Sequence, residues 1–290
     1  MLLPSEELNE IVLGILGRAL KACPGVGIVA FSFVSNHYVM LLRAQDAGAL
    51  ARFMGYVNGN LAREAGRLYH WKEKFWGRRY RSIPVVDEAS QVARLRYVLA
   101  HGAKEGLVAR PADWPGATCL DGLLSGETLT GVWFDRTQEY NARRRGQKVG
   151  KYDFATRYEV PLVPMPCWEE LSEEQRRQQC ASLVADIEQE AAEENHRRGR
   201  VPPGPDFICN QHPHDTPREV KRSPAPQCHA ASKKARKAYC AVHDAVVTAF
   251  RAAAECLKAG NSDEAHFPPG CFPPGLPFVP FPPEVMGASP

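Results

Sequence analysis

Apolar side chains recur at helical spacing in three stretches of the first hundred residues. Residues 4–25 place their apolar positions on one side of a helix and offer Ser5 as an N-terminal cap. The same spacing predicts helices over 46–66 and 87–101, which begin at an aspartate and at an Asp-Glu pair. These three patterns predict amphipathic helices that pack on a common core.

Two β-rich runs, 27–34 and 36–43, lie between the first two predicted helices and flank a short turn. This arrangement predicts a β-hairpin. Side chains alternate along a strand, so His37 and Val39 share one face of the second run, and Tyr38 lies on the other. Helices combined with a hairpin in about a hundred residues predict an α+β fold.

The pattern changes after residue 124. We expect a first domain over 1–124, followed by a polar segment and a charged helix over 125–200. A Pro- and Arg-rich linker is predicted over 201–229, and a helix with a Pro- and Phe-rich tail over 230–290. The C-terminal extension is therefore expected to be mostly helical.

Composition narrows the class of protein. Hydrophobic residues make up 44% of the 290 residues and charged residues 24%, which is typical of globular proteins. No apolar run approaches the ~20 residues of a membrane span, and no secretory signal is visible, so no membrane partner is expected. Nine cysteines without a Cys-x-x-Cys pair favour reduced thiols and a cytoplasmic location.

The net charge of +3 hides a local basic patch. Residues 72–81 contain five basic residues and one acid, interleaved with aromatic residues. Lysine and arginine bind backbone phosphates, and aromatic rings stack on unpaired bases. The candidate DNA-binding residues are Lys72, Lys74, Trp76, Arg78, Arg79, Tyr80 and Arg81. The alternative is a solvated basic strand whose aromatic residues, Trp76 above all, pack inward. A second basic run, 143–145, is a weaker candidate for backbone contact because such runs are usually solvated.

Three segments in order carry a resemblance to a known family: SNHYVMLL, YHWKEKFWGRRYRSIPV and RLRYVLAHGAKEGLVARPADWPGA. Together they resemble the REP-associated tyrosine transposases, which are single-tyrosine HUH transposases of the insertion-sequence-200-like type. The resemblance covers about residues 5–120. It implies a ferredoxin-like core with an antiparallel sheet and helices on one face. The family's first strand, before the first helix, has no counterpart here, so the sheet is expected to lack it.

The resemblance also implies a chemistry. These enzymes cut and rejoin single-stranded DNA that carries hairpins, through a 5′-phosphotyrosine intermediate, and Tyr97 corresponds to the nucleophile. A divalent metal, Mg²⁺ or Mn²⁺, would be held by His37 and by His101, which lies one helical turn after Tyr97. The family's second strand histidine is Val39 here, so the metal is expected to be weakly held.

Two functions of different classes follow. The first is a DNA transposase that cleaves and transfers strands, with a possible homodimer as in relatives. The alternative is a structure-specific DNA-binding protein whose catalysis is lost because of Val39. A weaker third interpretation is a protein-interaction module whose basic patch is incidental.

Overall fold

The computed structural model describes residues 2–212 and 225–275. The chain divides into two compact units, Met1–Ala231 and Ser232–Pro290. This division lies next to the predicted boundary at 229/230, whereas the segment predicted over 125–200 belongs to the first unit. The fold is mixed α and β, as predicted, with two small antiparallel sheets.

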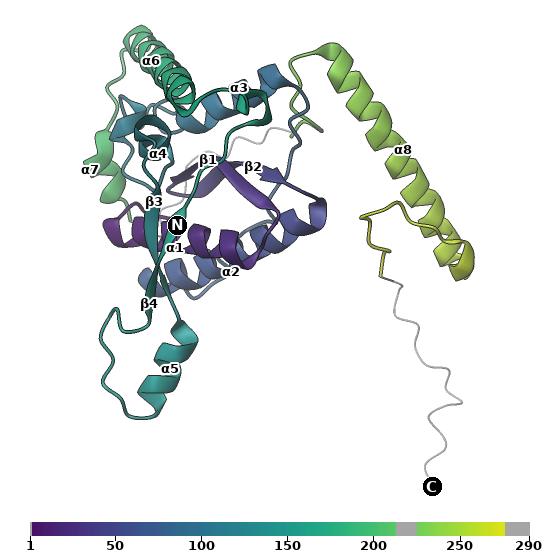
Figure 1. Ribbon diagram of the computed structural model, residues 1–290, viewed down its shortest axis with the longest axis horizontal. Coiled ribbons are helices and arrows are strands. Elements are labelled where there is room, and N and C mark those ends of the chain that lie inside the picture. The colour runs from purple at the N-terminus through teal and green to yellow at the C-terminus, as the bar shows by residue number, and fades with distance from the viewer. Residues whose placement is uncertain (1, 213–224, 276–290) are drawn as a thin grey trace. The chain divides into compact units, whose positions relative to one another are not determined.

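The predicted hairpin is confirmed. Strands β1 (Val26–Val34) and β2 (His37–Ala44) pair antiparallel around a two-residue turn, with Val34 opposite His37. Seven of the nine residues of β1 are buried. A strand buried on both faces needs covering elements on each side of the sheet. The hairpin is therefore the centre of the first unit (Figure 1).

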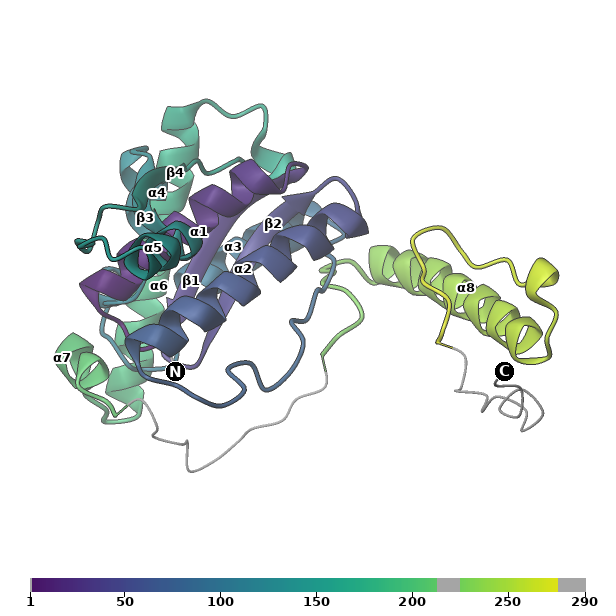
Figure 2. The ribbon, with the colours of Figure 1, turned by 90° about the horizontal axis from the view of Figure 1, so that it is seen from below.

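Helices α1 (Glu6–Ala22) and α2 (Ala47–Leu68) cover one face of the hairpin (Figures 1 and 2). Both match the predicted helices, and both begin as the sequence indicates. The Ser5 hydroxyl accepts a hydrogen bond from the Leu8 amide at 3.1 Å, and the Asp46 carboxylate accepts one from the Ala49 amide at 2.7 Å. These caps satisfy amides that the first helical turn leaves unpaired.

Helix α3 (Glu88–Leu99), capped by Asp87, lies on the opposite face of the hairpin (Figure 1). The alternation along β2 shows this directly. Tyr38 donates a hydrogen bond to Asn58 of α2 at 2.7 Å, whereas its neighbour His37 contacts His101, just beyond α3. The prediction of helices on one face is therefore wrong. Both faces of the hairpin are apolar, so each requires its own helical cover.

The second edge of β1 is also covered. Single bridges pair Ile28 with Leu162 and Ser32 with Thr118, so extended segments from later in the chain lie along this edge. Within the described residues the regular pairing of this sheet comprises β1 and β2 alone. The ferredoxin-like core, including its missing first strand, stays a prediction.

A second two-stranded sheet, β3 (Leu129–Phe134) and β4 (Ala155–Val160), packs on α1. The backbones approach closely, since a Cβ atom added at Gly14 of α1 would lie 2.1 Å from the Val132 carbonyl carbon. Glycine is required where two backbones come this near. This packing explains why residues beyond 124 belong to the first unit.

Further helices complete the first unit, and α6 confirms the predicted charged helix. They are α4 (Leu120–Ser125), α5 (Arg136–Arg144), α6 (Glu173–Arg197), α7 (Gly204–Cys209) and two 3₁₀ turns, Pro111–Asp113 and Pro166–Trp168. Helix α7 lies within the predicted linker over 201–229, of which residues 213–224 fall outside the described residues.

In its described residues, 232–275, the second unit contains α8 (Lys233–Lys258), which confirms the predicted helix, and a 3₁₀ turn, Ser262–Glu264. Phe250 and Phe267 pack edge to face with ring centroids 5.2 Å apart. Residues 276–290 of the predicted Pro- and Phe-rich tail lie outside the described part of the chain. Across the residues that the structure describes, no helix combines the length and the apolar character that a membrane crossing requires.

Candidate nucleic-acid groove and histidine pair

An open groove of about 1570 Å³ lies in the first unit between β2, α2, α3 and the basic segment. It brings together residues that are far apart in sequence. Six of the seven predicted DNA-binding residues line it, together with His37 and Tyr97; Lys72 does not. The predicted nucleophile, one predicted metal ligand and the basic segment therefore share one surface.

The cations and Trp76 of the basic segment make different contacts, although Trp76 and all of these cations except Lys72 border the groove. The cations at positions 72, 74, 78, 79 and 81 are exposed, and within the described residues no carboxylate pairs with them. Trp76 instead donates its indole N–H to the Asn58 carbonyl at 2.9 Å and packs edge-on against Tyr38. Trp76 thus fixes the segment to α2, while the cations remain available to phosphates.

His37, which lines the groove, contacts His101. Their Nε2 atoms lie 2.8 Å apart, with ring planes at 83°. On the other side of its ring, His37 Nδ1 lies 2.6 Å from Asn36 Oδ1. When Asn36 accepts from Nδ1–H, the Nε2 atom of a neutral His37 carries a lone pair directed at His101. The Asn36–His37 pair thus orients a ligand nitrogen.

Both imidazoles are electrically neutral near pH 7. Burial, followed by the nearby His37 and Lys104, lowers the pKa of His101 to about 4, and the residue is 3% exposed. Burial also lowers the pKa of His37, against an opposing effect of Glu105. The buried Nδ1 atom of His101 has no hydrogen-bond partner among the described residues. Neutral imidazole is the form that binds metals.

With Asn36 accepting from His37 Nδ1–H, the proton between the two rings lies on His101 Nε2, which donates to His37 Nε2; a divalent ion that replaced this proton would meet both nitrogens. Within 2–212 and 225–275 no cluster of three or more His, Cys, Asp or Glu side chains is arranged to hold a metal. Val39, the next residue on the same face of β2, pairs with Ser32 and supplies an apolar side chain. An ion at the pair would therefore take its other ligands from water or phosphate oxygens. The residues fit a weak site.

Tyr97 lies half-buried on α3, one turn before His101, with ring centroids 5.4 Å apart. Two cations flank its ring. The Arg94 guanidinium carbon lies 5.0 Å and the Lys104 ammonium 4.5 Å from the ring centroid. Neither cation was predicted from the sequence. Arg94 could have been found from its i,i+3 spacing to Tyr97, but Lys104 lies beyond the helix end, where spacing no longer fixes direction.

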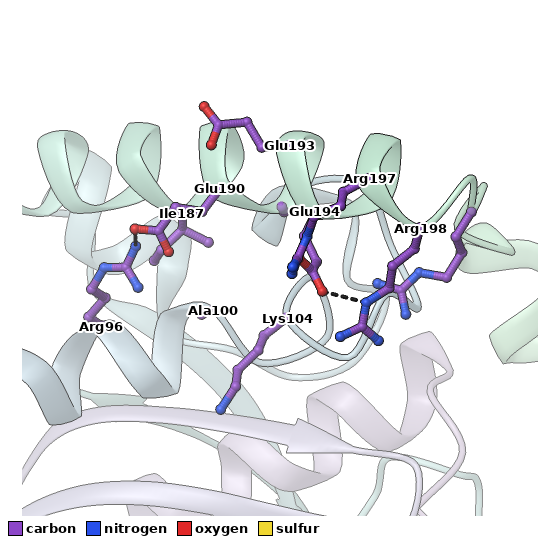
Figure 3. Close-up of a pocket in the computed structure, with 11 residues that line it drawn as sticks. Arg96, Ala100, Lys104, Ile187, Glu190, Glu193, Glu194, Arg197 and Arg198 are labelled. Atoms are coloured by element: carbon purple, nitrogen blue, oxygen red, sulfur yellow. Dashed lines mark hydrogen bonds and ion pairs between the residues drawn. The ribbon is translucent and has the colours of Figure 1, made fainter.

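A second pocket of about 670 Å³ lies between α3 and α6 (Figure 3). Three of its four arginines are paired with carboxylates. Arg96 pairs with Glu190 at 2.7 Å, and Arg197 and Arg198 both pair with Glu194. Paired cations offer less charge to an anionic ligand, so this pocket is best described as an ion-paired helix interface.

Comparison of the chain with protein-family models, curated proteins and solved structures finds no match in any of the three. The family resemblance accordingly rests on the three quoted segments alone, and the function is derived below as a proposal.

Proposed function

We propose that this protein binds single-stranded DNA and cleaves and rejoins it through Tyr97. The observation that carries the proposal is the convergence of two imidazole Nε2 atoms, 2.8 Å apart, one helical turn from Tyr97. The exposed cations that line the adjoining groove add support, because they suit a phosphate backbone. The strand would follow these cations and present one phosphodiester to Tyr97.

In the proposed reaction the Tyr97 phenolic oxygen forms a bond to phosphorus, and the bond from phosphorus to the 3′ oxygen breaks. The Tyr97 phenol gives up its proton to solvent and the departing 3′ oxygen takes one up, so the products are a 5′-phosphotyrosine and a free 3′-hydroxyl. Reversal of the step with another 3′-hydroxyl rejoins the strand. Arg94 and Lys104 place two positive charges beside the Tyr97 ring, where the anionic phosphodiester would bind. A divalent ion at His37 and His101, when bound, would supply Lewis-acid polarisation of the phosphate.

A second candidate is a DNA-binding protein of the same architecture that does not cleave. The observation that favours it is Val39, which leaves two imidazoles where the resemblance implies three protein ligands. In that case the groove would hold a strand, and Tyr97 would pack between two cations without reacting.

The test is to incubate the protein with labelled single strands that carry hairpins, in the presence of Mn²⁺, and to look for a covalent protein–DNA adduct. We expect an adduct that Tyr97→Phe abolishes. Tyr140→Phe is the matched control, because Tyr140 lies exposed on α5 and retains its adduct in this account. Binding without an adduct would favour the second candidate. Absence of any salt-sensitive binding to DNA would contradict both.

A further inference from the structure

The connection between β3 and β4, residues 135–154, forms a projecting arm that carries α5 (Figure 1). The arm begins and ends at one point of the sheet, where the Asp135 amide donates to the Phe154 carbonyl at 2.8 Å. Asp135 also caps α5 through the Gln138 amide at 2.9 Å. The arm is therefore an ordered extension of the second sheet.

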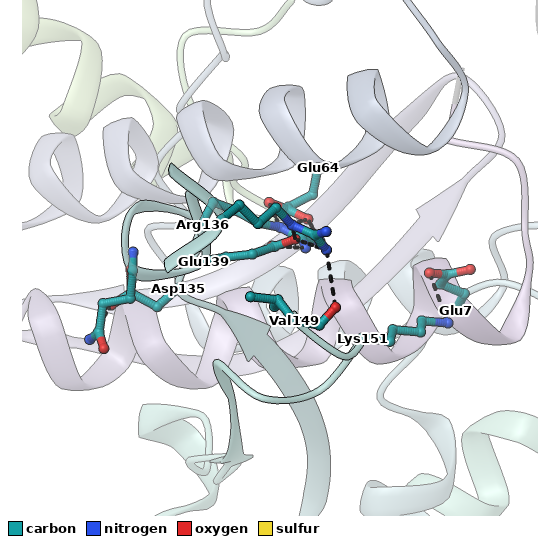
Figure 4. Close-up of polar contacts among 9 residues, drawn as sticks. Glu7, Glu64, Asp135, Arg136, Glu139, Val149 and Lys151 are labelled. Atoms are coloured by element: carbon teal, nitrogen blue, oxygen red, sulfur yellow. Dashed lines mark hydrogen bonds and ion pairs between the residues drawn. The ribbon is translucent and has the colours of Figure 1, made fainter. Parts of the chain in front are cut away.

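Ion pairs fasten the arm to α1 and α2 (Figure 4). The Arg136 guanidinium donates to both carboxylate oxygens of Glu64 on α2, at 3.0 and 3.1 Å from Nε, and also pairs with Glu139. Lys151 pairs with Glu7 of α1 at 3.1 Å. A bidentate pair fixes direction as well as distance. The two ends of the arm are thus held in place relative to the helices.

The six cations of the arm fall into two groups. Three are paired with carboxylates: Arg136, Arg143 and Lys151. The other three, Arg144, Arg145 and Lys148, are exposed, and no carboxylate in the described part of the chain pairs with them. A cation in the last turn of α5 interacts favourably with the helix dipole, which accounts for Arg144 and Arg145. Lys148 lies beyond the helix, so the dipole does not account for the positive charge of all three residues.

We propose that Arg144, Arg145 and Lys148 bind the phosphate backbone of double-stranded DNA. The proposal rests on the function proposed above for the choice of DNA as the anionic partner. A duplex keeps its bases stacked inside, so cations alone can hold it. A single strand calls for aromatic rings beside the cations. Of the two exposed aromatic residues of the arm, Tyr152 packs on Phe134 of β3 with ring centroids 5.9 Å apart, which leaves Tyr140 beside the three cations. This arrangement suits the paired part of a folded strand.

The test compares Arg144→Gln/Arg145→Gln/Lys148→Gln with the wild-type protein. A matched control removes the same charge from the first turn of α8, as Lys233→Gln/Lys234→Gln/Arg236→Gln. Binding to a hairpin with a long stem and to an unpaired strand of equal length is measured over a range of salt concentrations. Each lost phosphate contact lowers the salt slope for a duplex by about 0.9, so we expect a fall of about 2–3 for the hairpin. The unpaired strand and the control variant should be unaffected.

Several outcomes would overturn the inference. One is that the arm variant loses affinity equally for the hairpin and for the unpaired strand. Another is that the arm variant binds the hairpin as the wild-type protein does. If that variant instead loses binding to anionic lipid vesicles, the arm binds a membrane surface and not DNA. If the wild-type protein binds the unpaired strand while the arm variant leaves hairpin binding intact, the inference alone fails. If the wild-type protein binds only duplex, and does so through the arm, the proposed single-strand function fails and the inference stands. Thermal melting confirms that each variant is folded.

Discussion

Substitution of Val39 by histidine tests the metal site most sharply, because one side chain decides how many nitrogens face the ion. Val39 lies two residues after His37 on the same face of β2, about 6.6 Å along the strand at ~3.3 Å per residue. An imidazole at this position would point to the side of the sheet on which His37 meets His101. The variant therefore offers three protein nitrogens in place of two.

The expected gain can be bounded. Loss of an outer-shell partner of a metal ligand typically costs 10–100-fold in affinity, so an added direct ligand should strengthen binding at least about tenfold, or about 1.4 kcal/mol. Without metal the change should cost about 1 kcal/mol, because a half-buried valine is lost. We expect Val39→His to be less stable than wild type in a chelator and to gain more stability from Mn²⁺.

Free Mn²⁺ measured by electron paramagnetic resonance during titration gives the dissociation constant, and urea unfolding with and without metal gives the stability. Met40→His is the matched control, since it adds an imidazole to the opposite face of the same strand. If Val39→His and Met40→His both bind Mn²⁺ as the wild-type protein does, the assignment of His37 and His101 to a metal site is wrong.

Three further predictions concern the scaffold. Arg136→Met leaves the Glu64 carboxylate, 8% exposed, without its partner and should lower the free energy of unfolding by about 3 kcal/mol. The double variant with Glu64→Leu should regain most of this stability in urea unfolding. Additive losses from the two substitutions would contradict this. Burial raises the pKa of Cys119 to about 12, so its thiol stays protonated at pH 8 and should react with a thiol reagent only on unfolding, unlike the exposed Cys209; fast labelling of Cys119 would contradict this. Trp76→Phe loses one hydrogen bond and should lower the free energy of unfolding by about 1 kcal/mol. A salt titration of single-strand binding should give the same slope as for the wild-type protein. A lower slope would contradict this.

The local elements of the first unit were predictable because their signals are local. Caps at Ser5, Asp46 and Asp87 mark three helix starts, and each accepts the expected amide hydrogen bond. The β3–β4 sheet was missed, since β3 contains a central glycine, β4 carries Arg157 and Glu159 on one side, and both strands acquire their place only by packing on α1. The close contact at Gly14 depends on residues far away in sequence, which periodicity does not report.

The part of the site that depends on local spacing along α3 was also predictable. Helical spacing places His101 one turn after Tyr97, and the structure brings the two rings together. The convergence of His101 with His37 depends on α3 lying on the same face of the hairpin as His37, which strand alternation alone does not determine. Lys104 approaches Tyr97 from the turn after α3, and its direction is set by the fold of that turn.

The central claim is that Tyr97 is the residue that becomes joined to DNA. Peptide mapping by mass spectrometry, after reaction of a hairpin-bearing single strand with the wild-type protein and with Val39→His in Mn²⁺, tests it directly. The account predicts a 5′-phosphotyrosine at Tyr97, in greater yield for Val39→His. A nucleotide attached to another residue, or none in either protein under conditions where both bind the strand, would contradict it.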